Sequence, residues 1–421
     1  MNKPVYVVGM GVCNSVAQNI ADFADGLRAG VSGICKLDGM LGKMYEDTVW
    51  IGGEIRNYNF NNVVQNNTER VPDICRTALA TARRSSLSVQ TAITSALEAW
   101  LDADLDQADI DPHRIALVVV SQYTTGQHII DGLKTFSEAP EYVSPRLALE
   151  YQETYALGVL SKVFGIRGEG FNVGGASASG NLALIKAAQL LALDSADVCL
   201  VCGVGTVLTE LELQSFSNLG ALGGRRFADR PEQASRPFDR QREGFIYGQG
   251  SGCIVLEQAS SLRKRSAKPL ARLAGACSCL SVEDGASPSL ETEIFVMKEA
   301  VSTAGASLDN VGYVNAHGTS SQVGDDIEAR ALTELFASRR VLVNSTKSLI
   351  GHCLATAGLQ EAMATIVQLN QGFRHKSANL EEPIRADIGL LDSLTFDDSR
   401  LALSNSFGFS GIHSSILFEL E

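Results

Sequence analysis

The sequence lacks the features that would place it in a membrane, on nucleic acid or around a metal. No apolar run in its 421 residues is long enough to span a bilayer. The 35 basic residues against 48 acidic ones leave a net charge of −13, which argues against general nucleic-acid binding. No pair of CxxC motifs and no Cys/His cluster has tetrahedral zinc spacing, so we expect no metal site.

Nine cysteines are scattered along the chain, most of them in apolar runs such as DVCLVCGVG (197–205). This placement favours buried, reduced thiols. The opening MNKPVYVVGMGVC has one lysine and a short apolar run, which fits a buried first strand better than a signal peptide. We therefore expect a soluble, cytoplasmic protein.

Short apolar runs rich in β-branched residues alternate with helical patterns. The helical pattern is clear in SVQTAITSALEAWLDA (88–103) and GLQEAMATIVQLNQG (358–372). Strands this apolar are usually covered by helices on both faces, so the alternation predicts an α/β fold. The predicted strands cover residues 4–9, 114–120, 197–205, 252–257, 311–318, 340–345 and 414–420.

Two turns rich in small residues each precede a helical pattern. One surrounds Ser177, and the other is GHCLATAG, which begins at Gly351. This repetition, together with the length of the chain, suggests duplicated halves. The stretch QASSLRKRSAKP (258–269) is the candidate connector, and we expect its four basic residues to form a solvated face.

The stretch FNVGGASASG (171–180) has the pattern of a strand, a tight turn and a helix start, where many enzymes place a nucleophile. Its tip is Ser177, and no histidine or acid lies nearby in sequence to activate it. His317 and His352 lie beside Gly, Ser and Thr in loops at predicted strand ends, where α/β proteins commonly build sites. We expect the other four histidines to be ordinary packed or surface residues: His113, His128, His375 and His413.

Five separated motifs resemble those of the β-ketoacyl synthases, the condensing enzymes of fatty-acid and polyketide assembly. NAHGTSSQVGD (315–325) is similar to their first histidine motif, and STKSLIGH (345–352) to their lysine and second histidine motif. ASRPFDRQREGFIYGQGSG (234–252) is similar to their mid-chain signature, and NSFGFSGIH (405–413) to their gating loop. The fifth motif is the N-terminal stretch, residues 4–34, which matches how such proteins begin. The resemblance therefore runs from about residue 4 to about residue 420 in the family's order.

The resemblance implies the thiolase fold, in which two duplicated βα halves form a five-layered αβαβα sandwich. The N-terminal half, residues 1–258, would carry Ser177. The C-terminal half, residues 259–421, would carry His317, Lys347 and His352.

The family's site residues transfer onto this chain by their motifs. Ser177 stands at the position of the nucleophilic cysteine, while His317 and His352 correspond to the two catalytic histidines and Lys347 to the family lysine. The resemblance also assigns a supporting polar network, two hydroxyls that hold a phosphopantetheine arm, and a gating phenylalanine. The polar network is Asp325, Glu328 and Glu361. The two hydroxyls belong to Thr319 and Ser321, and the gating phenylalanine is Phe409.

The gating phenylalanine carries a further expectation, and its loop departs from the family pattern. The backbone N–H of Phe409 is expected to form an oxyanion hole with that of Ser177. Ser410, Ile412 and His413 stand where the family has Gly-Thr-Asn. The departure leaves the geometry of the loop open.

The partners implied by the resemblance are an acyl carrier protein and a second copy of the chain. The carrier brings the phosphopantetheine, so no cofactor is expected on the protein itself. In the family, the strand near residues 169–174 pairs across the two-fold axis of a homodimer. Because the carrier is acidic, basic side chains are candidates for docking it: Arg70, Arg76, Arg83 and Arg84.

Serine in place of cysteine separates the two half-reactions of a condensing enzyme. Acyl transfer needs a thiolate, and a helix N-terminus cannot ionise a serine hydroxyl as it can a thiol. Decarboxylation of malonyl-carrier needs only donors for the enolate oxygen. The leading hypothesis is therefore a ketosynthase-like malonyl-acyl carrier protein decarboxylase, which makes acetyl-acyl carrier protein and CO2. The chain also resembles the synthase-like decarboxylases with serine in place of this cysteine, and that resemblance implies a role in polyketide β-branching.

Three alternatives remain open from the sequence. A non-catalytic partner of the chain-length-factor type also lacks the cysteine, although such proteins typically lose part of the histidine set. An acyltransferase could form an ester on Ser177 with His352 recruited as its base. The serine could also be an engineered replacement in an ordinary β-ketoacyl synthase.

Overall fold

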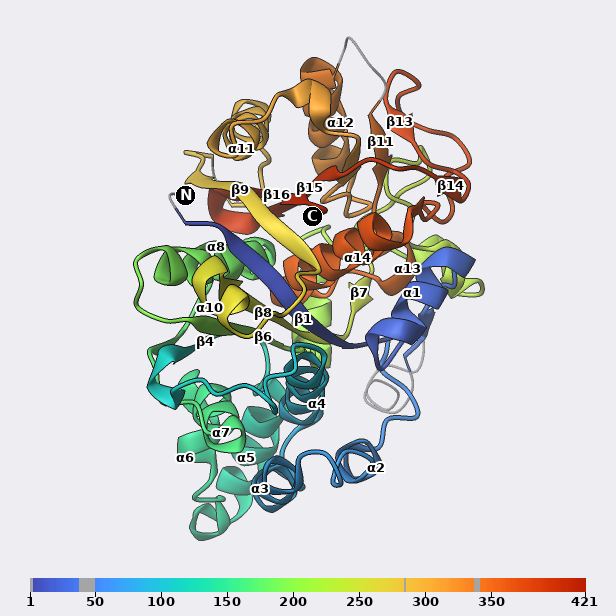
Figure 1. Ribbon diagram of the computed structural model, residues 1–421. Helices are drawn as coiled ribbons and strands as arrows, with labels where there is room; N and C mark the ends of the chain where they lie inside the picture. The colour runs from blue at the N-terminus through green and yellow to red at the C-terminus, as the bar shows by residue number, and fades with distance from the viewer. Residues whose placement is uncertain (1–2, 38–49, 284, 337–340) are drawn as a thin grey trace.

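Alternating layers of helices and strands make up the chain (Figure 1). The structure, a computed structural model, describes residues 3–37, 50–283, 285–336 and 341–421. Two central helices lie between two groups of strands, and further helices cover the outer face of each group. This is the five-layered αβαβα arrangement, so the predicted fold class is confirmed.

The two groups of strands share one topology. Numbered by their succession along the chain, the strands of each group lie side by side in the order 3-2-4-5-1. In both groups the second strand is parallel to its two neighbours, and the fourth and fifth strands form antiparallel pairs. The first group is β1 (Val5–Asn14), β4 (Ile115–Ser121), β5 (Gly170–Asn172), β6 (Val198–Val204) and β8 (Gly250–Gln258). The second is β9 (Ala271–Leu280), β10 (Tyr313–Asn315), β11 (Leu342–Asn344), β15 (Leu401–Gly408) and β16 (Ile412–Glu419).

All seven predicted strands are present, with ends shifted by a few residues. Residue 340, the first of one predicted strand, lies outside the described residues. The strands β4, β6 and β8 are buried on both faces, which is why their apolar runs were easy to identify. The search for apolar runs in the sequence did not find β9, because the second half of this strand is partly exposed and most of its side chains are small.

The helices fall into an inner pair and two outer groups. The inner pair is buried between the strand groups: α8 (Ser179–Ala192) and α14 (Ala357–Gln371). The helices over the first strand group are α3 (Pro72–Ala82), α4 (Leu87–Asp102) and α7 (Thr154–Phe164). Those over the second are α11 (Leu290–Thr303) and α12 (Gln322–Phe336).

The remaining elements connect these layers or extend their edges. The connecting helices are α1 (Ile20–Ala29), α2 (Phe60–Gln65), α5 (Gly126–Glu138), α6 (Leu147–Glu150), α9 (Glu210–Asn218), α10 (Ala259–Lys264) and α13 (Lys347–Ile350). The short strands are β2 (Ile34–Lys36), β3 (Ile51–Gly53), β7 (Tyr247–Gly248), β12 (Phe373–Arg374), β13 (Gly389–Leu390) and β14 (Thr395–Phe396). In the described part of the chain, no helix combines the length and the apolar character that a membrane crossing requires.

The predicted connector at 258–269 is only partly a solvated face. Three of its four basic residues are exposed, but Arg265 is not. Its guanidinium pairs with the buried carboxylate of Glu257 at 2.6 Å and donates to the main-chain oxygen of Ala103 at 2.7 Å. A fully buried carboxylate needs such a partner, so the prediction was wrong for Arg265.

The boundary between halves at residue 258 stays a prediction, and the repeated strand order supports it.

The two inner helices touch at glycines. A Cβ atom on Gly180 would lie 2.6 Å from the main-chain nitrogen of Leu359, and one on Gly358 would lie 2.8 Å from that of Asn181. Both glycines belong to the small-residue turns that the sequence repeats. Close approach of the two backbones therefore explains why these turns are rich in small residues.

We expect Gly358→Ala to destabilise the protein by about 1–3 kcal/mol, because the methyl group would overpack the contact between the inner helices. Gly158→Ala is the matched control. Gly158 lies inside α7 with open space where its Cβ would be, so alanine there should stabilise the helix by about 0.5–1 kcal/mol. Thermal unfolding of the two variants checks the prediction, and equal melting temperatures would contradict it.

Candidate active site

Ser177 lies on a sharp turn between β5 and α8. Its predecessor, Ala176, has a φ of +47°, a left-handed conformation that L-residues adopt at a cost of roughly 1–3 kcal/mol. The Ser179 hydroxyl braces the turn, since it donates to the Ala176 carbonyl at 2.7 Å and accepts from the Gly175 N–H at 2.8 Å. The strained turn holds the half-buried Ser177 side chain at the start of the central helix.

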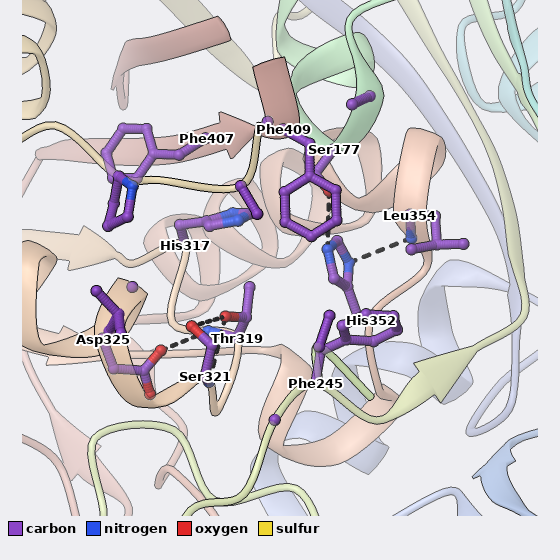
Figure 2. Close-up of a pocket in the computed structure, with 18 of the residues that line it drawn as sticks. Ser177, Phe245, His317, Thr319, Ser321, Asp325, His352, Leu354, Phe407 and Phe409 are labelled. Carbon is purple, nitrogen blue, oxygen red and sulfur yellow. Dashed lines mark hydrogen bonds between the residues drawn. The ribbon is translucent and has the colours of Figure 1, made fainter. Parts of the chain in front are cut away.

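The second small-residue turn places His352 next to Ser177. Leu354, in this turn, also has a positive φ, +49°. Nε2 of His352 lies 2.9 Å from the Ser177 hydroxyl oxygen, and Nδ1 accepts a hydrogen bond of 3.2 Å from the main-chain N–H of Leu354 (Figure 2). The tertiary structure therefore joins two residues that are 175 positions apart in the sequence.

The bond from Leu354 determines which nitrogen of His352 carries the proton. A neutral imidazole has one N–H and one acceptor nitrogen. Burial, and then the charge of Lys347, hold the pKa of His352 well below its usual range, so the ring is neutral. Because Nδ1 accepts, the proton is on Nε2, and His352 donates to the Ser177 oxygen.

His317 is held in the same tautomer by Lys347. Lys347 Nζ lies 3.2 Å from Nδ1 of His317, donates to the main-chain oxygen of His317 at 2.7 Å, and forms an ion pair with Glu361. An ammonium has only donors, so Nδ1 accepts and Nε2 carries the proton. Burial, followed by Lys347, His352 and His413, holds the pKa of His317 well below its usual range.

Glu328 and Asp325 support the loop that carries His317. The two Glu328 oxygens accept from the main-chain N–H groups of His317 and Gly318, each at 2.8 Å. Asp325 accepts from the N–H of Thr319 at 3.0 Å, and burial raises its pKa to about 7. Of the three acids that the resemblance places in the lysine network, Glu361 alone pairs with Lys347.

The predicted site residues surround one cavity of about 610 Å³. The side chains of Ser177, His317 and His352 meet in it, and the two imidazole rings are perpendicular with centroids 5.7 Å apart. The predicted residues that also line this cavity are Thr319, Ser321, Asp325, Glu328 and Phe409. Lys347 and Glu361 are buried behind His317.

The loop predicted to act as a gate lines this cavity. Phe409 is part of a short turn between β15 and β16, and its ring lies beside Ser177 in Figure 2. The Ser410 N–H donates to the Gly285 carbonyl at 2.7 Å, which ties the gate to a second loop. A Cβ on Gly408 would lie 2.6 Å from the Gly175 carbonyl, so the gate backbone runs against the Ser177 turn. The oxyanion hole expected from the N–H groups of residues 177 and 409 stays a prediction.

The hydroxyls proposed to hold a phosphopantetheine arm form their own small network. Thr319 donates to the Ser321 hydroxyl at 2.9 Å (Figure 2).

Among the residues that the structure describes, no group of three histidine, cysteine or acidic side chains is arranged to hold a metal ion.

Sequence reasoning missed four residues that shape the cavity. Phe245 packs edge-on against His352 at 5.4 Å, and Phe407 lies between His317 and His413 at 5.5 and 5.2 Å. His413, expected to be an ordinary packed or surface residue, lines the cavity, and its departure from the family pattern was the available signal. Buried Glu293 also lines it, and nothing in its helical surroundings in the sequence marked it.

Comparison with known proteins finds one family over most of the chain. Residues 2–261 match the β-ketoacyl synthase N-terminal domain, and residues 275–381 match the C-terminal domain. The polyketide biosynthesis malonyl-ACP decarboxylase PksF of Bacillus subtilis is 34% identical over 99% of this chain and 96% of its own length. The chloroplastic 3-oxoacyl-(acyl-carrier-protein) synthase II of Arabidopsis thaliana is 30% identical over 99% of this chain and 75% of its own length.

Solved structures agree on the fold. A type II PKS acyl-carrier protein in complex with its ketosynthase (AntDE:AntF) superposes with a TM-score of 0.87, at 24% identity over the full length of both chains. A β-ketoacyl synthase from Burkholderia phymatum STM815 gives 0.85 at 23% identity, again over both full chains. At such identities the likeness establishes the thiolase fold.

The buried ion pair gives a testable consequence. We expect Lys347→Met to destabilise the protein by about 3–5 kcal/mol, because it leaves the Glu361 carboxylate buried without a cation. The double variant Lys347→Met with Glu361→Gln should regain most of this loss. Lys298→Met, on the exposed face of α11, is the control and should change stability by less than about 0.5 kcal/mol. Thermal unfolding measures all three, and a double variant as unstable as the single one would contradict the expectation.

Proposed function

The chain belongs to the β-ketoacyl synthase family, and from this premise we propose that it is a decarboxylase which converts malonyl-acyl carrier protein to acetyl-acyl carrier protein and CO2 in polyketide biosynthesis. One observation supports this most strongly. Both imidazoles present an N–H to a cavity whose nucleophile position holds a serine. The likeness to PksF over nearly the whole of both chains points the same way, and β-branching is the pathway that we propose for it.

The serine does not accept an acyl group. A serine nucleophile needs a base that takes its proton. The neighbouring Nε2 of His352 already carries a proton, because Nδ1 accepts from the Leu354 N–H. His352 therefore donates to the serine oxygen and cannot activate it. This argues against the acyltransferase alternative, in which Ser177 forms an ester.

The two N–H groups serve the decarboxylation step instead. When the bond between the malonyl carboxylate carbon and its neighbour breaks, negative charge develops on the thioester oxygen. Donors already in place at that oxygen stabilise the enolate without reorganisation. Nε2–H of His317 is one such donor, and Nε2–H of His352 is the second once the thioester oxygen replaces the Ser177 hydroxyl as its acceptor. Lys347 and the Leu354 N–H keep both rings in the donating tautomer. The intact pair argues against a non-catalytic chain-length-factor role.

The substrate arrives on the phosphopantetheine of its carrier. We propose that Thr319 and Ser321 hold this arm, since both hydroxyls line the cavity beside His317. The carrier-docking candidates divide into two groups. Arg70 already contacts Asp104 and Asp106, and Arg76 contacts Asp73. The exposed pair Arg83 and Arg84 is the better proposal for docking an acidic carrier.

We also propose that the protein is a homodimer. The insertion between β4 and α7 exposes large apolar side chains, which a monomer rarely leaves in contact with water. They are Ile130, Leu133, Phe136, Tyr142, Leu149 and Tyr151. The neighbouring β5 is the edge strand of the sheet, where a second copy can add its own strand. A cytoplasmic location stays a prediction.

The activity is tested by mixing the purified protein with malonyl-carrier and following CO2 release and the intact mass of the carrier. We expect wild type to give acetyl-carrier, and His317→Ala to lose on the order of 100- to 1,000-fold in rate, as when one oxyanion donor is removed. Ser177→Cys should allow acylation of residue 177, detected by peptide mass. His113→Ala, at an exposed site outside the cavity, is the matched control. Wild type that releases no CO2 would refute the proposal.

The dimer is tested by light scattering on the eluting protein. We expect wild type to have the mass of two chains, and Leu133→Asp with Phe136→Asp to have the mass of one, because buried carboxylates at the contact disfavour association. Leu193→Asp, at a still more exposed position outside the insertion, should remain dimeric. Wild type with the mass of one chain would contradict the proposed dimer.

A further inference from the structure

Decarboxylation without condensation creates a demand for a proton. When the C–C bond of the malonyl group breaks, its electron pair stays on the α-carbon of the enolate. In a condensing enzyme that carbon attacks an acyl group, but here it must take a proton to become the methyl group of acetyl-carrier. The question of which group supplies that proton rests on the proposed function.

The two catalytic histidines are poor donors for this step. Each has a single N–H, on Nε2, and its other nitrogen accepts from Lys347 or from the Leu354 N–H. A ring that gave up this proton to carbon would become an imidazolate. Ser177 is a far weaker acid than a carboxyl group, and its oxygen accepts from His352.

Other carboxyl groups on the cavity wall are already engaged as acceptors. The two oxygens of Glu328 accept main-chain N–H groups of the His317 loop, and Asp325 accepts those of Phe238 and Thr319. Burial raises the pKa of both groups, that of Asp325 to about 7. Each of their four oxygens is nevertheless held by a main-chain N–H, and protonation of either carboxyl group would weaken one of these bonds.

Glu293 differs from these groups. Glu293 is 1% exposed and lines the same cavity as Ser177 and His317. Its Oε2 has no hydrogen-bond partner among the described residues. An ionised carboxylate in such a place would be costly, whereas a neutral acid is tolerated. Burial, and then the negative charges of Glu328 and Asp325, raise the pKa of Glu293 well above its usual range. Burial at this site therefore favours the protonated form of the Glu293 carboxyl group.

The position of Glu293 is fixed relative to the catalytic loop. It belongs to the first turn of α11, and Met297, one turn later, contacts the Asn405 amide at 3.2 Å. The same amide donates to Glu328 at 3.1 Å, and Glu328 holds the main chain of His317. The start of α11 is thus tied to the loop that positions one enolate donor.

We propose that Glu293 is the proton donor that converts the enolate into the acetyl group. The O–H bond of its carboxyl group breaks, a C–H bond forms at the enolate carbon, and the thioester carbonyl is restored. Glu293 is left as a carboxylate, which takes up a proton from the solvent after the product leaves. Each turnover therefore consumes one solvent proton and needs no other co-reactant.

The decisive variant is Glu293→Gln, which keeps the size of the side chain and removes its acidic proton. We expect steady-state formation of acetyl-carrier to fall on the order of 10²- to 10⁴-fold, the usual contribution of a general acid. Release of CO2 in the first turnover should stay near the wild-type rate, because enolate formation does not need this proton. Glu291→Gln, at an exposed position on the same helix, is the matched control and should behave as wild type.

Unchanged acetyl-carrier formation in Glu293→Gln would overturn the proposal. A parallel loss of first-turnover CO2 would also overturn it, since the residue would then act on enolate formation or on the fold. Wild type without CO2 release would instead refute the proposed function, so the two failures are distinguishable.

The pH dependence of the wild type gives a second measurement that needs no variant. Steady-state turnover should fall as the pH rises through the raised pKa of Glu293, while first-turnover CO2 release should not. The titratable groups around Glu293 are Glu328 and Asp325 of α12, His413 of β16 and His317. The two histidines are already neutral below this range, so their titration does not produce the alkaline fall. Asp325, with a pKa of about 7, also titrates here, but it supports the His317 loop, so its titration would change first-turnover CO2 release as well. Equal falls in both rates would contradict the assignment.

Discussion

The site depends on one constraint: Nδ1 of each catalytic imidazole already accepts a hydrogen bond. Lys347 occupies Nδ1 of His317, and the Leu354 N–H occupies Nδ1 of His352. Burial keeps both rings neutral, so each has a single proton, and that proton points into the cavity. Two donors therefore converge where an enolate oxygen forms, and neither ring is available as a base for Ser177.

The duplicated fold creates this constraint. Each half ends a strand near a turn with a left-handed residue, Ala176 in one half and Leu354 in the other, and then starts an inner helix. The inner helices meet at glycines, which brings the two turns together. A side chain at position 177 must then face His352. The hydroxyl in that place accepts a hydrogen bond where a thiolate would attack, so the same geometry favours C–C cleavage and disfavours acyl transfer.

Much of the fold and part of the site followed from local patterns. Strands such as β4 and β6, buried on both faces, and the long helices α4 and α14 have strong signals, and the motifs named Ser177, His317 and His352. His413 is packed, as predicted, but it also lines the cavity, which only its neighbours in the tertiary structure reveal. Glu293 had no local signal at all, since an acid in the first turn of a helix is ordinary and only its burial against α12 makes it unusual.

The sequence by itself determined the α/β class, which depends on periodicity. Its short motifs determined the family, and with it the expected layers and the nucleophile position. Only the tertiary structure decided the protonation pattern. Tautomers follow from which donor lies beside which nitrogen, and the bond between Ser177 and His352 joins residues 175 positions apart. Proton affinities depend likewise on burial and on neighbouring charges, which no stretch of sequence contains.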